Sequence, residues 1–123
     1  MYNVEKLRSK VKKAYIAIQT NSESRIHEIE DVKSEWESEE FKKYRESFGK
    51  LSLMIPESIG LELFGHLTEL VSCGTNFSAL VITRQYTNPG IVKSLERMYM
   101  ILPIMKEEEN VINQHYSKLE RKE

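Results

Sequence analysis

The chain has 123 residues, of which 30% are charged, yet the charges nearly cancel to a formal net charge of −1. This balance gives no overall positive field, which argues against a protein that grips nucleic acid through bulk charge. A single cysteine excludes an intramolecular disulfide, and five glycines and three prolines are too few for the frequent turns of an all-β fold. We expect one helical domain, residues 1–123, with a core of its own.

The N-terminal third has a strong helical pattern. Apolar residues recur every three or four positions over residues 4–18 and again over 26–36, which is typical of one helix face. Between them, Thr20 precedes Glu23 by three residues, the spacing of a capping box that starts a new helix. Either one helix crosses this polar stretch or two helices meet near Thr20. Because the apolar stripe keeps its register, we predict one long N-terminal helix.

A shorter helix is predicted after Ser38, a good N-cap residue that is followed by two acidic residues. Gly49 is a natural stop for it. Its apolar face is aromatic and consists of Phe41, Tyr44 and Phe48. Residues 51–55 are apolar but have no partner strand, so we predict that they form a buried connector.

Two further helices are predicted in the second half of the chain. Pro56 opens one of them, and the pair Asn88–Pro89 is a strong start signal for the last. Pro103 lies inside the apolar stripe of the last helix, and the unbroken stripe favours a kink over a split. The elements together predict an all-α fold, a four- or five-helix antiparallel bundle with a long N-terminal helix and a Pro-kinked C-terminal helix.

The sequence also indicates in which compartment of the cell we expect the protein. The N-terminus shows no secretory signal, and the longest apolar run, residues 98–105, is far shorter than a transmembrane span. Lone-cysteine usage fits a reducing compartment. We therefore expect a cytoplasmic protein of bacterial or phage origin.

Two histidines have acidic neighbours at helical spacing, which raises the possibility of a metal site in a helical bundle. The candidate ligands are His27, Glu30, Glu62, His66 and Glu69. Further carboxylates would have to come from the acidic run 107–109. Because such spacing arises by chance in a chain with many acids, we predict no metal and no cofactor, and keep a metal-binding bundle as an alternative.

Neither the cysteine nor the basic residues give a stronger signal. Cys73 lies in an apolar segment with no base nearby in sequence, so we predict a small buried side chain and no enzyme. A basic cluster lies on the first predicted helix, opposite its apolar stripe: Lys6, Arg8, Lys10, Lys12 and Lys13. We interpret it as a solvated face, and keep a membrane-surface or nucleic-acid-binding role as another alternative.

The segment 98–105 is apolar on all sides, unlike a surface helix with one polar face. It is either the central helix of the bundle or partly covered by a second chain. Its methionines suit adaptable contacts. The residues predicted to contribute to a partner interface are Met98, Tyr99, Met100, Ile101, Ile104 and Met105.

Two short motifs resemble those of an uncharacterised family of small bacterial helical proteins. One is Trp36-x-Ser38-x-x-Phe41 followed by Tyr44-Arg45, and the other is the stretch 63–70. The resemblance covers residues 25–119 and implies a helical fold without an assigned activity or catalytic residue. Many members of that family carry an N-terminal membrane helix, which this chain lacks.

The sequence therefore predicts a non-enzymatic helical protein that acts through protein–protein contact, as an adaptor, inhibitor or regulator. The absence of a chemical motif and the all-round apolar segment both favour this interpretation. We expect self-association, most simply as a homodimer. No small-molecule substrate is evident.

Overall fold

The structure is a computed structural model that describes residues 2–122, with side chains described for residues 2–114. The described residues form five helices and no strands, which confirms the all-α prediction. The helices are α1 (Glu5–Gln19), α2 (Arg25–Trp36), α3 (Glu39–Leu53), α4 (Glu57–Ile82) and α5 (Pro89–Lys122).

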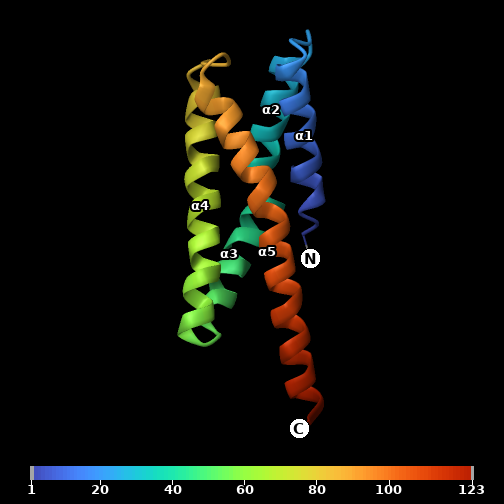
Figure 1. Ribbon diagram of the computed structural model, residues 1–123, viewed down its shortest axis with the longest axis vertical. Coiled ribbons are helices and arrows are strands. Elements are labelled where there is room, and N and C mark those ends of the chain that lie inside the picture. Colours follow the sequence, from blue (N-terminus) through green and yellow to red (C-terminus); the bar gives the residue numbers. More distant parts are fainter. Residues whose placement is uncertain (1, 123) are drawn as a thin grey trace.

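The helices form an up-and-down bundle of four arms, and one arm consists of two consecutive helices, α2 and α3. In Figure 1, α1 runs up, α2 and α3 follow one another downward, α4 runs up again and α5 runs down. α5 packs against both α4 and α1, while α3 packs against α4 and α2 packs against α1. α5 thus packs between α4 and α1, and α4 in turn contacts α5, α3 and α2.

The prediction of one long N-terminal helix is wrong, because the chain reverses direction after Thr20. The Thr20 hydroxyl donates to the carbonyl oxygen of Ile16 at 2.8 Å, and the backbone N–H of Ser22 donates to that of Ala17 at 2.8 Å. Asn21 has a φ of 50°, the left-handed conformation that commonly ends helices. α1 and α2 therefore form a hairpin, and the two halves of the apolar stripe face one another across it.

The N-terminus of α3 is as predicted, but its C-terminus is not. The backbone N–H of Phe41 donates to the Ser38 hydroxyl at 3.2 Å, which is the predicted cap. However, α3 continues through Gly49 to Leu53, whose side chain is 82% exposed. The segment 51–55 is therefore mainly the last turn of a helix rather than a buried connector.

The two starts predicted in the second half of the chain are confirmed. α4 begins directly after Pro56, and α5 begins at Pro89, where the Asn88 side-chain oxygen accepts from the N–H of Gly90 at 2.8 Å. α5 is continuous through Pro103, so the chain does not split there. Among the described residues, no helix combines the length and apolarity that crossing a bilayer requires.

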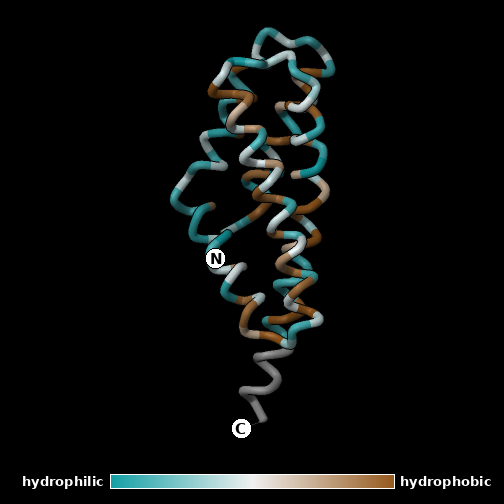
Figure 2. The backbone as a smooth tube through the Cα atoms, turned by 90° about the vertical axis from the view of Figure 1, so that its left-hand side faces the viewer, coloured by the Kyte–Doolittle hydropathy of each residue, from teal (hydrophilic) through white to brown (hydrophobic). Residues whose placement is uncertain are grey.

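The core is one cluster of buried side chains to which all five helices contribute. Figure 2 shows hydrophobic and hydrophilic positions alternating along the helices, as expected for elements with one buried face. Trp36 packs directly on Gly74 of α4, where any Cβ would overlap its indole ring. The tilted Phe41 ring lies 5.2 Å from the Trp36 ring, so an aromatic group joins α2, α3 and α4.

Candidate functional site

The structure divides the predicted partner segment, residues 98–105, into a buried and an exposed half. Met98, Ile101 and Met105 are buried in the core, because α5 packs against both α4 and α1. They belong to no surface, so the prediction is corrected for these three residues. Met100 and Ile104 are 59% and 45% exposed.

Tyr99, the sixth predicted residue, is half-buried beneath α1. The guanidinium of Arg8 lies 4.0 Å from the centre of its ring and donates to its backbone carbonyl at 3.4 Å. This cation–π contact fixes α5 against α1. Tyr99 is therefore only partly accessible at the surface.

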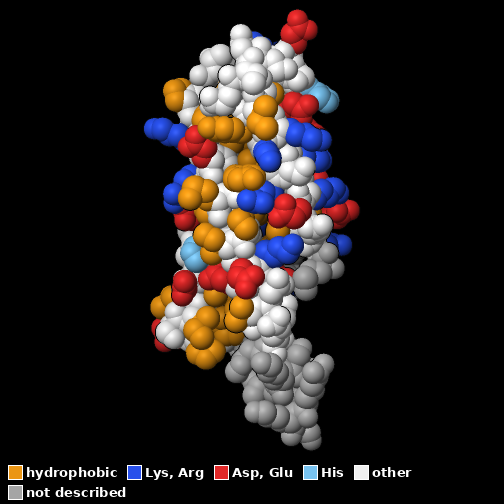
Figure 3. All heavy atoms as spheres, turned by 45° about the vertical axis from the view of Figure 1, so that its right-hand side comes forward, with side chains coloured by type: hydrophobic (Ala, Val, Ile, Leu, Met, Phe, Trp, Pro, Cys, Tyr) orange, Lys and Arg blue, Asp and Glu red, His pale blue; other side chains and the backbone are white. Residues whose placement is uncertain are grey.

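An exposed apolar ridge runs along the outer face of α5. It consists of Met100, Ile104 and Val111, and Val111 is 55% exposed. These positions differ by four and seven residues, so they share one side of the helix. Figure 3 shows hydrophobic side chains in a band down the face of the molecule, with charged groups on both sides and a row of acidic groups across its lower part. We call these three residues the α5 ridge.

An apolar groove lies between α1 and α5, on one side of the ridge. It encloses about 420 Å³, and its apolar lining includes Tyr15, Ile16 and Met100. Lys12 lies at the groove on α1, and Glu96 lies opposite on α5. This groove therefore has an apolar lining, with one positively and one negatively charged side chain beside it.

A second apolar groove lies between α4 and α5, on the other side of the ridge. It encloses about 520 Å³ and is lined by Ile59, Ile104 and Val111 together with other apolar side chains. Its charged lining residues, Glu62, Glu107 and Glu108, are all acidic. The two grooves thus share the α5 ridge but differ in the charge of their edges.

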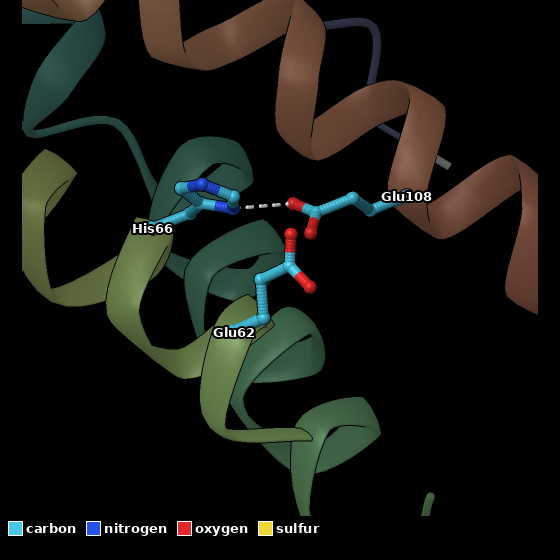
Figure 4. Close-up of side chains that lie close together, drawn as sticks. All are labelled: Glu62, His66 and Glu108. Carbon is cyan, nitrogen blue, oxygen red and sulfur yellow. Dashed lines mark hydrogen bonds and ion pairs between the residues drawn. The ribbon is translucent and has the colours of Figure 1, made fainter. Parts of the chain in front are cut away.

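At the edge of the second groove, a histidine and two glutamates from two helices come together. Glu62 and His66 are four residues apart on α4, and Glu108 reaches toward them from α5 (Figure 4). The Nδ1–H of His66 donates to Oε1 of Glu108 at 2.7 Å. One ligand atom from each residue lies within 4.8 Å of the others. Two of the predicted candidate ligands, Glu62 and His66, are therefore brought together with a carboxylate from the acidic run.

The other predicted candidate ligands are engaged elsewhere or lie apart. Glu30 accepts a hydrogen bond from the Tyr86 hydroxyl at 2.7 Å, and Glu69 forms an ion pair with Arg97. His27 is exposed on α2. Among the described residues, Glu62, His66 and Glu108 are the one group with metal-ligand spacing.

Part of the basic cluster of α1 forms ion pairs within the molecule. The ammonium groups of Lys10 and Lys6 lie 3.1 Å and 3.7 Å from a carboxylate oxygen of Glu35, whose side chain is buried. The Tyr2 hydroxyl donates to the same carboxylate at 2.9 Å. Sequence patterns gave no signal for this group, because Glu35 lies on α2 at a position indistinguishable from its acidic neighbours.

The electrostatics of Glu35 follow from these contacts. Burial alone would raise the pKa of its carboxyl, but hydrogen bonds from Lys10 and Tyr2 and the charge of Lys6 outweigh it, so the pKa lies below its ordinary value. Lys12 and Lys13 are exposed. Only part of the predicted basic surface is therefore free to meet phosphates or lipid headgroups.

A third cavity, of about 690 Å³, lies where α1, α3 and α5 approach one another. It is lined by side chains of both charges, including Lys6, Lys43 and Glu109, and by Tyr44. The buried Tyr44 hydroxyl has no hydrogen-bond partner among the described residues, and burial raises the pKa of Tyr44 and of Glu109. The mixed charges select no class of ligand.

Cys73 is not arranged as a nucleophile. It is half-buried on α4, where burial and the nearby Glu69 carboxylate raise the pKa of its thiol. A raised pKa keeps the thiol protonated, whereas reactive cysteines have a lowered one.

Comparison with known proteins adds no relative. No protein-family model matches this chain, and the comparisons with curated proteins and with solved structures found no match. The residues that suggest a function therefore lie on the α5 face and at the α4–α5 boundary.

Proposed function

We propose that this chain is a non-enzymatic helical protein that acts through protein–protein contact, and that it binds a second copy of itself. The observation that supports the proposal is the exposed α5 ridge, Met100, Ile104 and Val111, between two apolar grooves. Exposed apolar side chains that cluster beside apolar grooves commonly mark an interaction site.

A second copy fits because ridge and groove lie side by side on one face. In a twofold dimer the same patch is used by both subunits, so each ridge can enter the other copy's α1–α5 groove. Lys12 at the groove is positive, and Glu96 and Glu107 on the outer face of α5 are negative. A twofold axis between the copies brings these opposite charges together across the interface.

The size of the face indicates how tight the dimer is. From Glu96 to Val111 the helix rises about 22 Å, and α1, α5 and α4 together span about 18 Å at ordinary interaxial distances. The resulting flat footprint of about 400 Å² per copy, or about 800 Å² in total, lies below the roughly 1,200–2,000 Å² of stable interfaces and is typical of a weak, transient contact. We therefore expect a dimer that dissociates on dilution.

Light scattering coupled to size exclusion tests the proposal over a concentration series. The wild-type chain should shift from dimer to monomer on dilution, and Met100→Glu and Ile104→Glu should be monomeric at every concentration. Leu53→Glu is the matched control, because Leu53 is 82% exposed at the end of α3, away from the ridge. A wild-type chain that stays monomeric, or a dimer abolished by Leu53→Glu and kept by Met100→Glu, would overturn it.

A further inference from the structure

The geometry at the α4–α5 boundary points to a second property: we infer that Glu62, His66 and Glu108 bind a divalent transition-metal ion of the Zn²⁺ class. The site does not depend on the proposed dimer, because its three ligands come from one chain and lie on the α4 side of the α5 ridge. Each ligand atom lies within 4.8 Å of the other two.

The three side chains need only small movements to bind an ion. Zinc bonds of about 2.0–2.2 Å in tetrahedral geometry place the ligand atoms about 3.3 Å apart. His66 Nδ1 and Glu108 Oε1, now 2.7 Å apart, must separate by about 0.6 Å. Glu62 is exposed and points toward Glu108 in Figure 4, so its carboxylate can close the remaining gap by rotating.

The charge of the site favours a cation. Two carboxylates lie close to one another with a single imidazole beside them (Figure 4), and among the described residues no lysine or arginine forms an ion pair with Glu62 or Glu108. By contrast, the nearby Glu69 is neutralised by Arg97. A divalent ion replaces the imidazole proton and balances both negative charges.

The helices behind the ligands are held firmly, which favours a defined site. Leu63 and Leu67 follow the ligands on α4, Met105 precedes Glu108 on α5, and all three side chains are buried. One imidazole and two carboxylates suit Zn²⁺, Mn²⁺, Fe²⁺ or Co²⁺ more than the all-oxygen preference of Ca²⁺. Three protein ligands leave at least one position open for water.

Titration calorimetry with ZnCl₂ on the metal-free full chain tests this inference. We expect saturable binding of one ion per chain and at least about tenfold weaker binding for His66→Ala and Glu108→Gln, since even outer-shell changes at metal sites cost that much. His27→Ala is the matched control, because His27 is an exposed histidine that belongs to no group of three closely spaced ligand atoms among the described residues. Its affinity should equal that of the wild-type chain.

A second readout does not depend on variants that must fold. The long-range proton–nitrogen spectrum of the histidine rings should show the Nδ1 resonance of His66 moving on addition of Zn²⁺, while that of His27 stays in place. Absence of saturable Zn²⁺ binding, or binding that survives His66→Ala unchanged, would overturn the site. The measurement can be made on the monomeric Met100→Glu variant, so failure of the dimer and failure of the metal site are distinguishable.

Discussion

Replacing Gly74 with alanine should destabilise the bundle, although alanine is the better helix former. A Cβ at position 74 would lie well under 3.0 Å from three atoms of the Trp36 indole ring, a separation that real Cβ atoms essentially never show. The ring cannot easily retreat, because it is 4% exposed and the Phe41 ring and the Arg45 guanidinium lie 5.2 Å and 4.5 Å from it. α2 and α4 must therefore move apart.

The magnitude follows from two opposing effects. Overpacking a core costs up to about 3 kcal/mol, while exchanging glycine for alanine in a helix gains about 1 kcal/mol. We expect Gly74→Ala to lose about 2 kcal/mol net from these two principles. Gly65 is the matched control on the same helix, because a Cβ there meets nothing within 4 Å. Gly65→Ala should gain up to about 1 kcal/mol.

Urea unfolding separates these outcomes, followed by circular dichroism and by the fluorescence of the single tryptophan. The two variants should differ by about 3 kcal/mol, or by about 2 M in urea midpoint for a slope of about 1.5 kcal/mol per M. If Gly74→Ala is as stable as Gly65→Ala, the close packing of Trp36 on α4 is refuted.

Three further changes probe stability by the same urea assay. Glu35→Gln should cost about 1–2 kcal/mol at neutral pH, since it removes charge-assisted hydrogen bonds. The folded pKa of Glu35 is lowered, so the stabilisation that its carboxylate gives the folded state is complete above the ordinary carboxyl pKa and is lost as the pH falls through the folded pKa. The Glu35→Gln variant should therefore lose less stability in acid than the wild-type chain. Equal losses would contradict this. Ser38→Ala removes the cap of α3 and should cost about 1 kcal/mol, whereas an unchanged midpoint would contradict a stabilising cap. Tyr44→Phe removes a buried hydroxyl without a described partner and should leave stability unchanged or raise it; a clear loss would show that this hydroxyl is hydrogen-bonded.

The parts of the fold that sequence predicts best depend on local chemistry. Ser38 and the Asn88–Pro89 pair start helices through bonds to backbone groups two or three residues away. These helix starts can therefore be predicted from a few neighbouring residues. The apolar faces are predicted for the same reason, because helical periodicity alone determines which side chains share a face.

The wrong predictions of helix ends arise where two local sequence signals compete, and tertiary packing determines whether the helix ends or continues. The apolar stripe keeps its register across Thr20, but a hairpin buries both halves against one another, which a straight helix cannot do. Gly49 is a common stop signal, yet α3 continues past it, and an added Cβ there would only touch Leu67 at 3.4 Å. In both cases the packing against a neighbouring helix decides between the competing local signals.

The candidate sites were only partly accessible to sequence patterns. Spacing on one helix predicts that Glu62 and His66 share a face, but the choice of Glu108 from the acidic run depends on how α5 packs on α4. Likewise, an all-round apolar segment does not say which of its sides is covered. The structure assigns Met98 to the core and Met100 to the surface, two positions that composition treats alike.

An isotope-filtered NOE experiment on an equimolar mixture of ¹³C-labelled and unlabelled chains tests the proposed dimer most directly. If each α5 ridge enters the other copy's α1–α5 groove, the Met100 methyl group of one chain should show cross-peaks to Tyr15 and Ile16 of the other. At concentrations where the chain is fully associated, intermolecular cross-peaks confined to other surfaces would contradict the account, as would a sample that gives none.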